Sequence, residues 1–295
     1  MRFWLALLLA GCTSHEPEPV PKVTAPLPAP STSASAPPVV EPSRPQNVLG
    51  EFHTLYEFKG KHEGRAKNIR FGAGKLDGVE IAPGATFSFN ETVGPRTLQN
   101  GFFLAKEIYL GELVDGIGGG TCQVSSTLFA AGLLADLDIV ERRPHSRPLR
   151  YTKPGLDATV AFPDEATCKK DPNCSDLKLR NPYSFPVRLV SAWIVEGTKE
   201  KVILQVLGEG TPPSVRVQWW ANETAPFKKR MRKTGKFLGK YKKRVQSGSD
   251  GLSGVLMVQG GRTPRKILSQ YAPVDEVWEV GLGWDMSEMP WDTEP

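Results

Sequence analysis

The sequence contains no long hydrophobic run beyond its first residues. No later stretch approaches the roughly 18 apolar residues that a membrane-spanning helix needs. Histidine is also scarce, with 4 in 295 residues, and no two cysteines have the CxxC spacing that is typical of zinc sites. We therefore predict neither a metal site nor a cofactor, and no second membrane segment.

The first residues have the layout of an export signal. A positive residue, an apolar run and two small residues precede Cys12. This layout resembles the bacterial lipobox, in which the cysteine after the cleavage site carries the lipid, and an ordinary secretory signal is the alternative. We expect residues 1–11 to be a signal peptide and a lipid on Cys12 to anchor the chain to a membrane in the extracytoplasmic cell envelope. Thr13 and Ser14 lack an aspartate that would retain it at an inner membrane, which favours an outer membrane if the host has one.

A tether is predicted after the lipidated cysteine, over residues 12–47. Residues 17–45 are almost entirely Pro, Ala, Ser, Glu and Val and include no aromatic residue, so they cannot bury a core. Proline-rich chains favour the polyproline II conformation at ~3.1 Å per residue, and about 30 residues would therefore reach up to roughly 90 Å. We expect this tether to let the folded part reach beyond the membrane surface.

The formal net charge of +5 is modest, but its distribution is uneven. Residues 228–244 contain ten Lys or Arg in 17 positions. A solvated basic face is the simplest interpretation. The functional interpretation is attraction to an anionic envelope polymer, such as teichoic acid, lipid head groups or peptidoglycan carboxylates, and not to nucleic acid.

Three cysteines remain once Cys12 is assigned to lipid. Cys168 and Cys174 lie six apart in a polar loop with a Pro-Asn turn signal, and we predict that they form a disulfide in the oxidising envelope. Two metal ligands completed by a histidine are the weaker alternative. This leaves Cys122 as an odd thiol, which is either buried and inert or kept for chemistry.

Cys122 follows three glycines and precedes an apolar segment with helical periodicity. We predict a buried helix with Thr121 as its N-cap, so that Cys122 lies in the first turn, where free N–H groups and the helix dipole favour a thiolate. The same N–H groups can stabilise an oxyanion. No Gly-Lys-Ser/Thr ending follows the glycines, which argues against a phosphate loop. The predicted substrate and oxyanion loop comprises Gly118, Gly119, Gly120, Gln123, Ser125 and Ser126.

Two residues downstream complete a candidate nucleophilic site. His145 follows a short predicted strand and lies in a proline-bounded polar loop, whereas the other three histidines lie in polar stretches far from the glycine loop. Asp157 opens an alternating segment, 157–162, which we predict to be a strand. A cysteine activated by a histidine, with a carboxylate orienting the ring, is the minimum for thiol acyl chemistry. A structural histidine and a small apolar cysteine are the alternatives.

The motifs around these residues resemble the VanW family in the family's own order. The resemblance runs from about residue 68 to residue 208. It implies that Cys122 is the nucleophile of a peptidoglycan L,D-transpeptidase, an activity of some VanW domains. The Cys168 to Cys174 insertion departs from the usual pattern, and we expect it to alter the substrate rim. The matching segments are 83–90, 93–97, 118–128, 141–142, 145–146 and 155–160.

A weaker resemblance covers the C-terminal region. Residues 245–255, 265–269 and 273–281 are similar to the small β module of cell-wall enzymes that is named for its five glycines. The resemblance implies binding to wall sugars. A plain β-rich cap is the alternative.

We predict two folded domains. The first, residues 48–209, is expected to be α+β, with an antiparallel sheet around one buried central helix and a hairpin formed by 186–195 and 201–207. The second, residues 210–295, is expected to be small and all-β.

The expected function is acyl transfer on peptidoglycan stem peptides. Cys122 would attack the carbonyl that follows an L-centre, with His145 moving protons and Asp157 orienting the ring. The alternative is a non-catalytic wall-binding lipoprotein that recognises stem peptides or shields them from glycopeptides.

Overall fold

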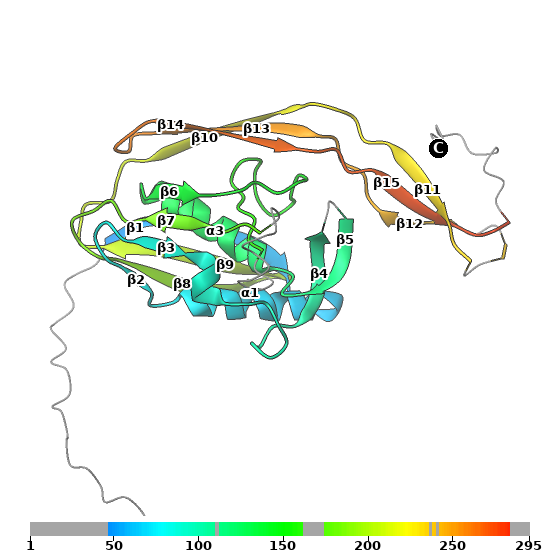
Figure 1. Ribbon diagram of the computed structural model, residues 1–295, viewed down its shortest axis with the longest axis horizontal. Coiled ribbons are helices and arrows are strands. Elements are labelled where there is room, and N and C mark those ends of the chain that lie inside the picture. The colour runs from blue at the N-terminus through cyan, green and yellow to red at the C-terminus, as the bar shows by residue number, and fades with distance from the viewer. Residues whose placement is uncertain (1–46, 110–111, 162–173, 236–237, 240–241, 284–295) are drawn as a thin grey trace, which may run out of the picture. The chain divides into compact units, whose positions relative to one another are not determined.

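The computed structural model describes residues 47–109, 112–161, 174–235, 238–239 and 242–283 (Figure 1). The predicted signal peptide, the predicted lipidation site Cys12 and most of the predicted tether lie outside these residues, as does Cys168. Lipidation and the pairing of Cys168 with Cys174 therefore stay predictions. Within the described residues, no helix has the length and apolar character needed to cross a membrane.

The largest sheet has four antiparallel strands in the order β1-β9-β8-β2 (Figure 1). These strands are β1 (Asn47–Glu57), β9 (Lys199–Gly208), β8 (Val187–Glu196) and β2 (Glu80–Ile81). The predicted hairpin is confirmed, since β8 pairs with β9 from Arg188 to Glu196. Alternate residues of β9, including Val202, Leu204 and Val206, are fully buried, so one face of the sheet borders the core.

Helix α3 (Thr121–Leu134) confirms the helix predicted after the glycines. It contacts β1, β9, the strand β6 (Asp138–Glu141) and the helix α1 (Glu63–Leu76), and nearly all of its side chains are buried. The predicted N-cap is wrong. Gly120, with φ 115°, caps the helix, and Thr121 is its first residue, whose hydroxyl donates to the Gly118 carbonyl over 3.0 Å. A left-handed residue is needed to turn the chain into the helix here, and glycine adopts that conformation without a steric penalty.

Helix α1 (Glu63–Leu76) was not expected from the sequence. It contains Gly64, Gly72 and Gly74, and each glycine costs a helix about 1 kcal/mol relative to alanine. Tertiary packing overrides this preference. A Cβ on Gly64 would lie 2.3 Å from the Leu104 carbonyl oxygen, so the close approach of the strand that begins at Leu104 requires glycine. The short helices η1 (Gly60–His62) and α2 (Phe89–Val93) flank α1 in the chain.

Two smaller sheets complete the region before residue 209. One has the order β3-β7-β6 and the other is the β4-β5 hairpin. All of their pairings are antiparallel. Their strands are β3 (Thr86–Ser88), β7 (Lys178–Arg180), β6 (Asp138–Glu141), β4 (Leu104–Tyr109) and β5 (Glu112–Ile117).

The predicted strand 157–162 is wrong for the residues that the structure describes. Residues 157–160 belong to no strand, and Ala161 forms only an isolated bridge with Ser175. The polar groups of this extended segment bond elsewhere: the Ala158 main chain bonds serine hydroxyls of α3, and Thr159 N donates to the Arg143 carbonyl. The alternation that suggested a strand reflects burial against α3.

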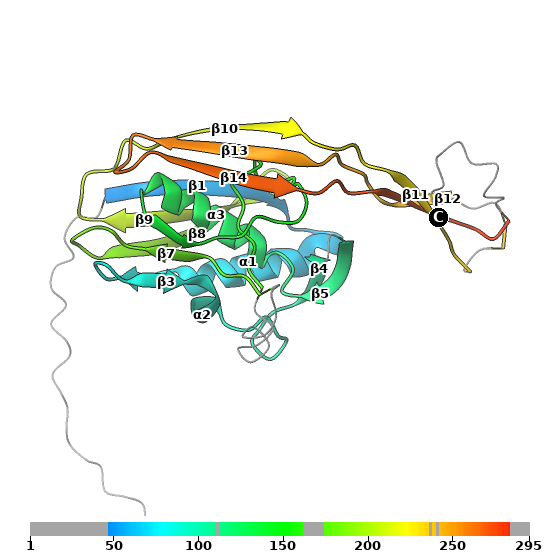
Figure 2. The ribbon, with the colours of Figure 1, turned by 45° about the horizontal axis from the view of Figure 1, so that its top comes forward.

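In the described part of 210–295, every regular element is a strand. The first sheet has the antiparallel order β10-β13-β14, with β13 in the middle (Figure 2). The second has the order β11-β15-β12, with β11 parallel to β15. The domain boundary at 209/210 stays a prediction. The strands are β10 (Arg216–Glu223), β11 (Lys229–Lys233), β12 (Lys242–Gln246), β13 (Leu252–Gln259), β14 (Arg265–Tyr271) and β15 (Glu276–Val280).

The fold as a whole consists mainly of antiparallel sheets with few helices, so it is more β-rich than the expected α+β class. The core gathers buried side chains of α1, α3 and the large sheet. Phe129, Leu128 and Leu133 of α3 are fully buried in it. Burying each such side chain stabilises the fold by about 1.5–3 kcal/mol, so the position of α3, and of Cys122 at its start, is firmly fixed.

Candidate active site

Cys122 occupies the first turn of α3, beside the extended segment 157–160. It is a free cysteine and is partly buried. Its Sγ lies 3.4 Å from the Val160 carbonyl oxygen, which accepts from the neutral thiol. The first turn of a helix leaves the Cys122 N–H without an intrahelical acceptor. The thiol therefore lies next to a main-chain donor, as acyl chemistry at this position requires.

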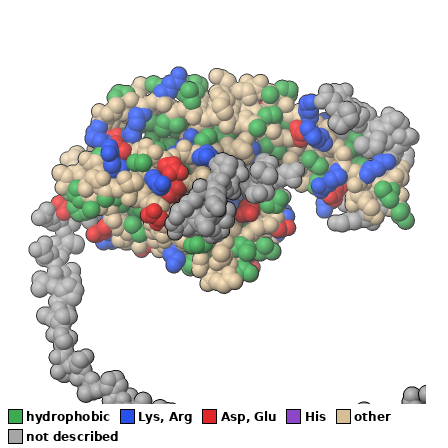
Figure 3. All heavy atoms as spheres, viewed as in Figure 1, with side chains coloured by type: hydrophobic (Ala, Val, Ile, Leu, Met, Phe, Trp, Pro, Cys, Tyr) green, Lys and Arg blue, Asp and Glu red, His purple; other side chains and the backbone are tan. Residues whose placement is uncertain are grey.

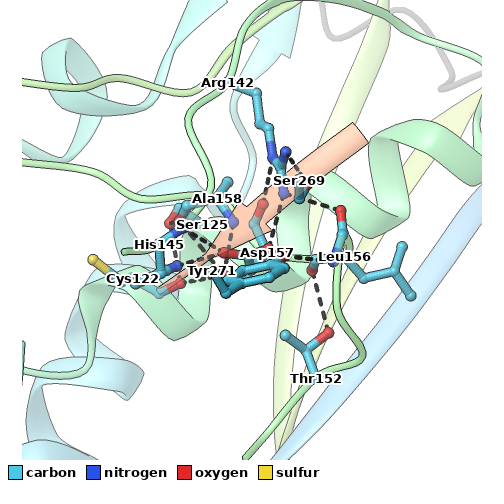
Figure 4. Close-up of polar contacts among 12 residues, drawn as sticks. Cys122, Ser125, Arg142, His145, Thr152, Leu156, Asp157, Ala158, Ser269 and Tyr271 are labelled. Carbon is cyan, nitrogen blue, oxygen red and sulfur yellow. Dashed lines mark hydrogen bonds and ion pairs between the residues drawn. The ribbon is translucent and has the colours of Figure 1, made fainter. Parts of the chain in front are cut away.

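His145 and Asp157 converge on the same point from two loops (Figure 4). His145 lies after β6 and is buried. Its Nδ1 lies 2.7 Å from Asp157 Oδ2, and its main-chain N–H donates to the same oxygen, also over 2.7 Å. An ionised carboxylate only accepts, so Nδ1 carries a proton and Nε2 is the ring nitrogen that is left for the thiol. The structure thus brings together the three residues that the sequence singled out.

The pKa values of the thiol and the ring move in opposite directions. Burial raises the pKa of Cys122, but a hydrogen bond with His145 and the charge of that ring outweigh burial, and the net pKa is lowered. Burial lowers the pKa of His145, yet its hydrogen bonds with Asp157 and Cys122 raise it to about 9. Both shifts favour the thiolate and imidazolium pair over the neutral pair, and the charged pair is the nucleophilic form.

The carboxylate of Asp157 is held by more than the histidine. Its Oδ1 accepts from Arg142 Nη2 over 2.8 Å and from the Tyr271 hydroxyl over 2.5 Å. Burial raises the pKa of Asp157, but His145, Arg142 and Tyr271 lower it overall. Arg142 also donates to Ser269 Oγ over 2.8 Å. Asp157 therefore stays ionised, and four hydrogen bonds hold its two carboxylate oxygens in place.

These supporting residues were not predicted from the sequence. Arg142 lies within a recognised motif, beside the histidine loop, and its charge next to a buried carboxylate is the signal that could have identified it. Ser269 and Tyr271 lie on β14, in the C-terminal region, and both side chains are buried. Nothing in the sequence links them to Asp157, because contacts over more than a hundred positions leave no local pattern.

The glycine loop has a specific conformation that other residues would not adopt. Gly118 and Gly120 have φ of 90° and 115°, in the region that favours glycine. A Cβ on Gly119 would lie 2.4 Å from the Lys106 carbonyl oxygen. The buried Asn68 of α1 donates to the Gly119 carbonyl over 3.0 Å and holds the loop in place. All three predicted loop glycines are therefore needed by the backbone.

Gln123, Ser125 and Ser126 are buried, and their side chains bond the protein. Ser125 Oγ donates to the Ala158 carbonyl over 2.7 Å, and Ser126 Oγ accepts from Ala158 N over 3.0 Å. Gln123 Nε2 donates to Thr54 Oγ1 over 2.8 Å. These contacts connect the first turns of α3 to the segment that carries Asp157 and to β1. Their geometry assigns these side chains a positioning role.

Among the residues that the structure describes, no group of three or more His, Cys, Asp or Glu side chains is placed to hold a metal ion. The chemistry that the described residues can perform here is that of an activated thiol. A thiolate, a protonated ring and an adjacent main-chain donor suffice for nucleophilic attack on a carbonyl.

Comparison with known proteins identifies the domain that carries this site. Over 139 residues the chain is 40% identical to YoaR of Bacillus subtilis, an uncharacterized protein, covering 47% of this chain and 42% of the relative. Over 158 residues it is 28% identical to the vancomycin B-type resistance protein VanW of Enterococcus faecalis, covering 52% of each chain. The chain thus spans about half the length of the curated relatives it matches. Residues 64–205 match the family described as VanW like protein, and this part of the chain is a VanW family domain.

Proposed function

We propose that this chain is a cysteine acyltransferase of the L,D-transpeptidase type that acts on the stem peptides of peptidoglycan. The observation that carries the proposal is the arrangement of Cys122, His145 and Asp157, with a thiol whose pKa is lowered and a ring held by a 2.7 Å contact to a buried carboxylate. Purely structural cysteines at helix starts need no charged partner, so this arrangement favours chemistry.

The proposed reaction has two balanced steps. In the first, the Cys122 thiolate forms a bond to the carbonyl carbon that follows an L-centre. The amide C–N bond then breaks, and the His145 imidazolium gives its proton to the departing amine. In the second step, an amine of a neighbouring stem attacks the thioester, His145 takes up its proton, and the C–S bond breaks. The thiolate is regenerated and the two stems are joined.

The location of the protein is part of the proposal. A lipid on Cys12 and a tether over 12–47 would hold the domain in the envelope, within reach of peptidoglycan. A disulfide between Cys168 and Cys174 would leave Cys122 as the single reactive thiol of the folded part. The basic segment 228–244 would attract anionic envelope polymer and bring the domain to its substrate, in keeping with the proposed wall-binding role of the C-terminal region.

One experiment tests the acyltransferase proposal directly. The mature chain, made without Cys12 and kept oxidised, is incubated with disaccharide-tetrapeptide fragments and followed by intact mass and product analysis. We expect a covalent adduct on Cys122 and either cross-linked dimers or exchange of the terminal D-residue. Cys122→Ala should abolish both and leave the circular dichroism spectrum unchanged, because the side chain lost is small.

The alternative function is non-catalytic recognition of the wall. The exposed basic strands β11 and β12 favour it, because they need no thiol to bind an anionic polymer. If wild type and Cys122→Ala bind the fragments equally well and no adduct forms, the acyltransferase proposal fails and the binding function replaces it.

A further inference from the structure

Two arginines flank the glycine loop that leads into Cys122. Arg65 comes from α1, and Arg96 lies just after α2. A Cβ on Gly118 would lie 2.6 Å from Arg96 Cβ, and a Cβ on Gly120 would lie 3.1 Å from Arg65 Cγ. The glycines therefore allow both arginine stems to pack directly against the loop that leads into Cys122.

Neither guanidinium forms an ion pair with a carboxylate within the part of the chain that the structure describes. Arg65 Nη2 donates to Gln123 Oε1 over 2.6 Å. Arg96 Nη1 and Nη2 donate to the Gly94 carbonyl over 2.7 Å and to Asn90 Oδ1 over 2.8 Å. All three acceptors are neutral.

The carboxylates that influence these arginines are engaged elsewhere, and the anionic form of Cys122 is the acid that acts on both. Glu57, which acts on Arg65 at longer range, pairs with His62 over 2.5 Å. Asp176, which acts on Arg96, accepts from Ser88 Oγ over 2.5 Å. Burial lowers the pKa of both arginines, and that of Arg96 falls to about 10. Removing cations from water without a carboxylate partner is costly, and the fold offers these two guanidiniums only the charge of the nearby thiol in return.

We propose that Arg65 and Arg96 form a carboxylate-binding site that recognises the free α-carboxylate of the residue that leaves the donor stem. The inference rests on the proposed acyl transfer, in which the scissile carbonyl lies at Cys122. In a leaving amino acid, the α-carboxylate is two bonds from the departing nitrogen, so it must lie close to the thiol. The planar guanidinium fork matches a carboxylate and binds it through two parallel hydrogen bonds.

This site would make the domain selective for uncapped donors. A stem that ends in a free carboxylate would satisfy both arginines, whereas a stem whose last residue is amidated would leave them unpaired. A site built for a charged group rejects the analogue that lacks the charge, because its buried polar groups then lose their partner.

The test measures binding apart from turnover. In the full mature chain carrying Cys122→Ala, calorimetry compares a synthetic stem tetrapeptide ending in D-alanine with the same peptide ending in D-alaninamide. We expect the acid to bind at least about tenfold more tightly, as charge-assisted hydrogen bonds predict. Arg96→Gln and Arg65→Gln should each reduce this preference, and Arg96→Lys, which keeps the charge but not the fork, should reduce it in part. Arg188→Gln, at an exposed position on β8, is the matched control and should leave it intact.

The outcomes separate this proposal from the proposed reaction. Equal affinity for acid and amide, or no binding of either, overturns the carboxylate site. A tenfold preference in the Cys122→Ala chain, together with no covalent adduct in wild type, supports the site and defeats acyl transfer. An adduct that forms at the same rate from both peptides supports acyl transfer and defeats the site. If the glutamine variants lose their melting transition, Arg96→Lys and the two-peptide comparison in the parent chain still decide the question.

Discussion

The two three-stranded sheets of the C-terminal region differ sharply in what their side chains contact. The β10-β13-β14 sheet directs Ser269 and Tyr271, both buried, toward the Arg142 and Asp157 side chains. The β11-β15-β12 sheet keeps its Lys and Arg side chains largely exposed. The first sheet therefore supplies contacts that stabilise the candidate active site, whereas the second sheet has no such contact among those described. This holds although the strands of the two sheets alternate along the chain.

Three ion pairs join arginines of the second sheet to β15 or to the residue before it. Arg232 pairs with Glu279 over 2.8 Å, Arg244 pairs with Glu276 over 3.2 Å, and Arg230 pairs with Asp275. Figure 3 shows Lys and Arg side chains gathered over this sheet, with Asp and Glu side chains among them. The basic segment 228–244 is thus partly neutralised by β15 and the residue before it, which lowers the net attraction that it can exert on an anionic polymer.

The largest difference in stability is expected between two arginine substitutions, one in the buried ion pair that the first sheet supports and one in an exposed ion pair of the second sheet. Arg142→Ala leaves a buried carboxylate without its arginine and should lower the free energy of unfolding by about 3–5 kcal/mol. The Arg142 and Asp157 side chains are 5% and 2% exposed, against 64% and 23% for Arg232 and Glu279. Arg232→Ala should therefore cost at most about 1 kcal/mol. Urea unfolding measures both, and equal losses would contradict the comparison.

The pH dependence of thiol alkylation should sharpen the comparison next. The lowered pKa of Cys122 places the rise in thiolate, and so in alkylation rate, at a lower pH than for an ordinary thiol. The ion pair persists until His145 loses its proton near pH 9. His145→Ala should move the rise to higher pH and slow acyl transfer by ~10²- to 10⁴-fold. Arg244→Ala in the second sheet should leave the profile unchanged, and peptide mapping should place the label on Cys122.

Tyr271→Phe should have a smaller but more specific effect. It removes the hydroxyl that donates to Asp157, and we expect a loss of about 1–3 kcal/mol together with slower alkylation of Cys122. Tyr183→Phe is the matched control, since its hydroxyl donates over 2.8 Å to the Ala135 carbonyl, away from the thiol. That variant should lose stability without losing reactivity. If both variants change reactivity equally, β14 has no special link to the site.

The smallest effect should follow from neutralising the exposed basic strands. Lys243→Gln combined with Arg232→Gln should leave stability and alkylation within error of wild type, because exposed ion pairs contribute little. Co-sedimentation with teichoic acid-containing walls should fall, and more so at low salt, where charge is less screened. Unchanged sedimentation would remove the second sheet from the proposed interaction with anionic polymer.

The sequence predicted the local features of this site well. The glycines and the apolar helix that follows them are adjacent in the chain. Both α3 and the position of Cys122 in its first turn could therefore be predicted from a short stretch of sequence. His145 and Asp157 could be singled out because candidate bases and carboxylates are few in that part of the chain. The capping glycine was missed, since Thr121 is the commoner type of N-cap and only the backbone conformation of Gly120 excludes it.

Long-range packing is what the sequence could not predict. Three glycines hid α1, because glycine lowers helix propensity and the close approach of a strand that requires Gly64 cannot be seen in the sequence. Residues 157–160 have the alternating pattern of a strand, but their main chain forms hydrogen bonds with α3 and with the loop that carries His145 and not with another strand. The role of Tyr271 depends on a contact with no local trace, so no pattern of residue spacing could have revealed it.

The bond from Tyr271 to Asp157 also bears on when the protein becomes reactive. The two residues are separated by 114 positions, and contacts between such distant residues form late, since a long loop must close first. During synthesis, Cys122 leaves the ribosome well before Tyr271, the last partner of Asp157. If the thiol is the proposed nucleophile, the hydrogen bonds that support it are complete only after nearly the whole protein has folded.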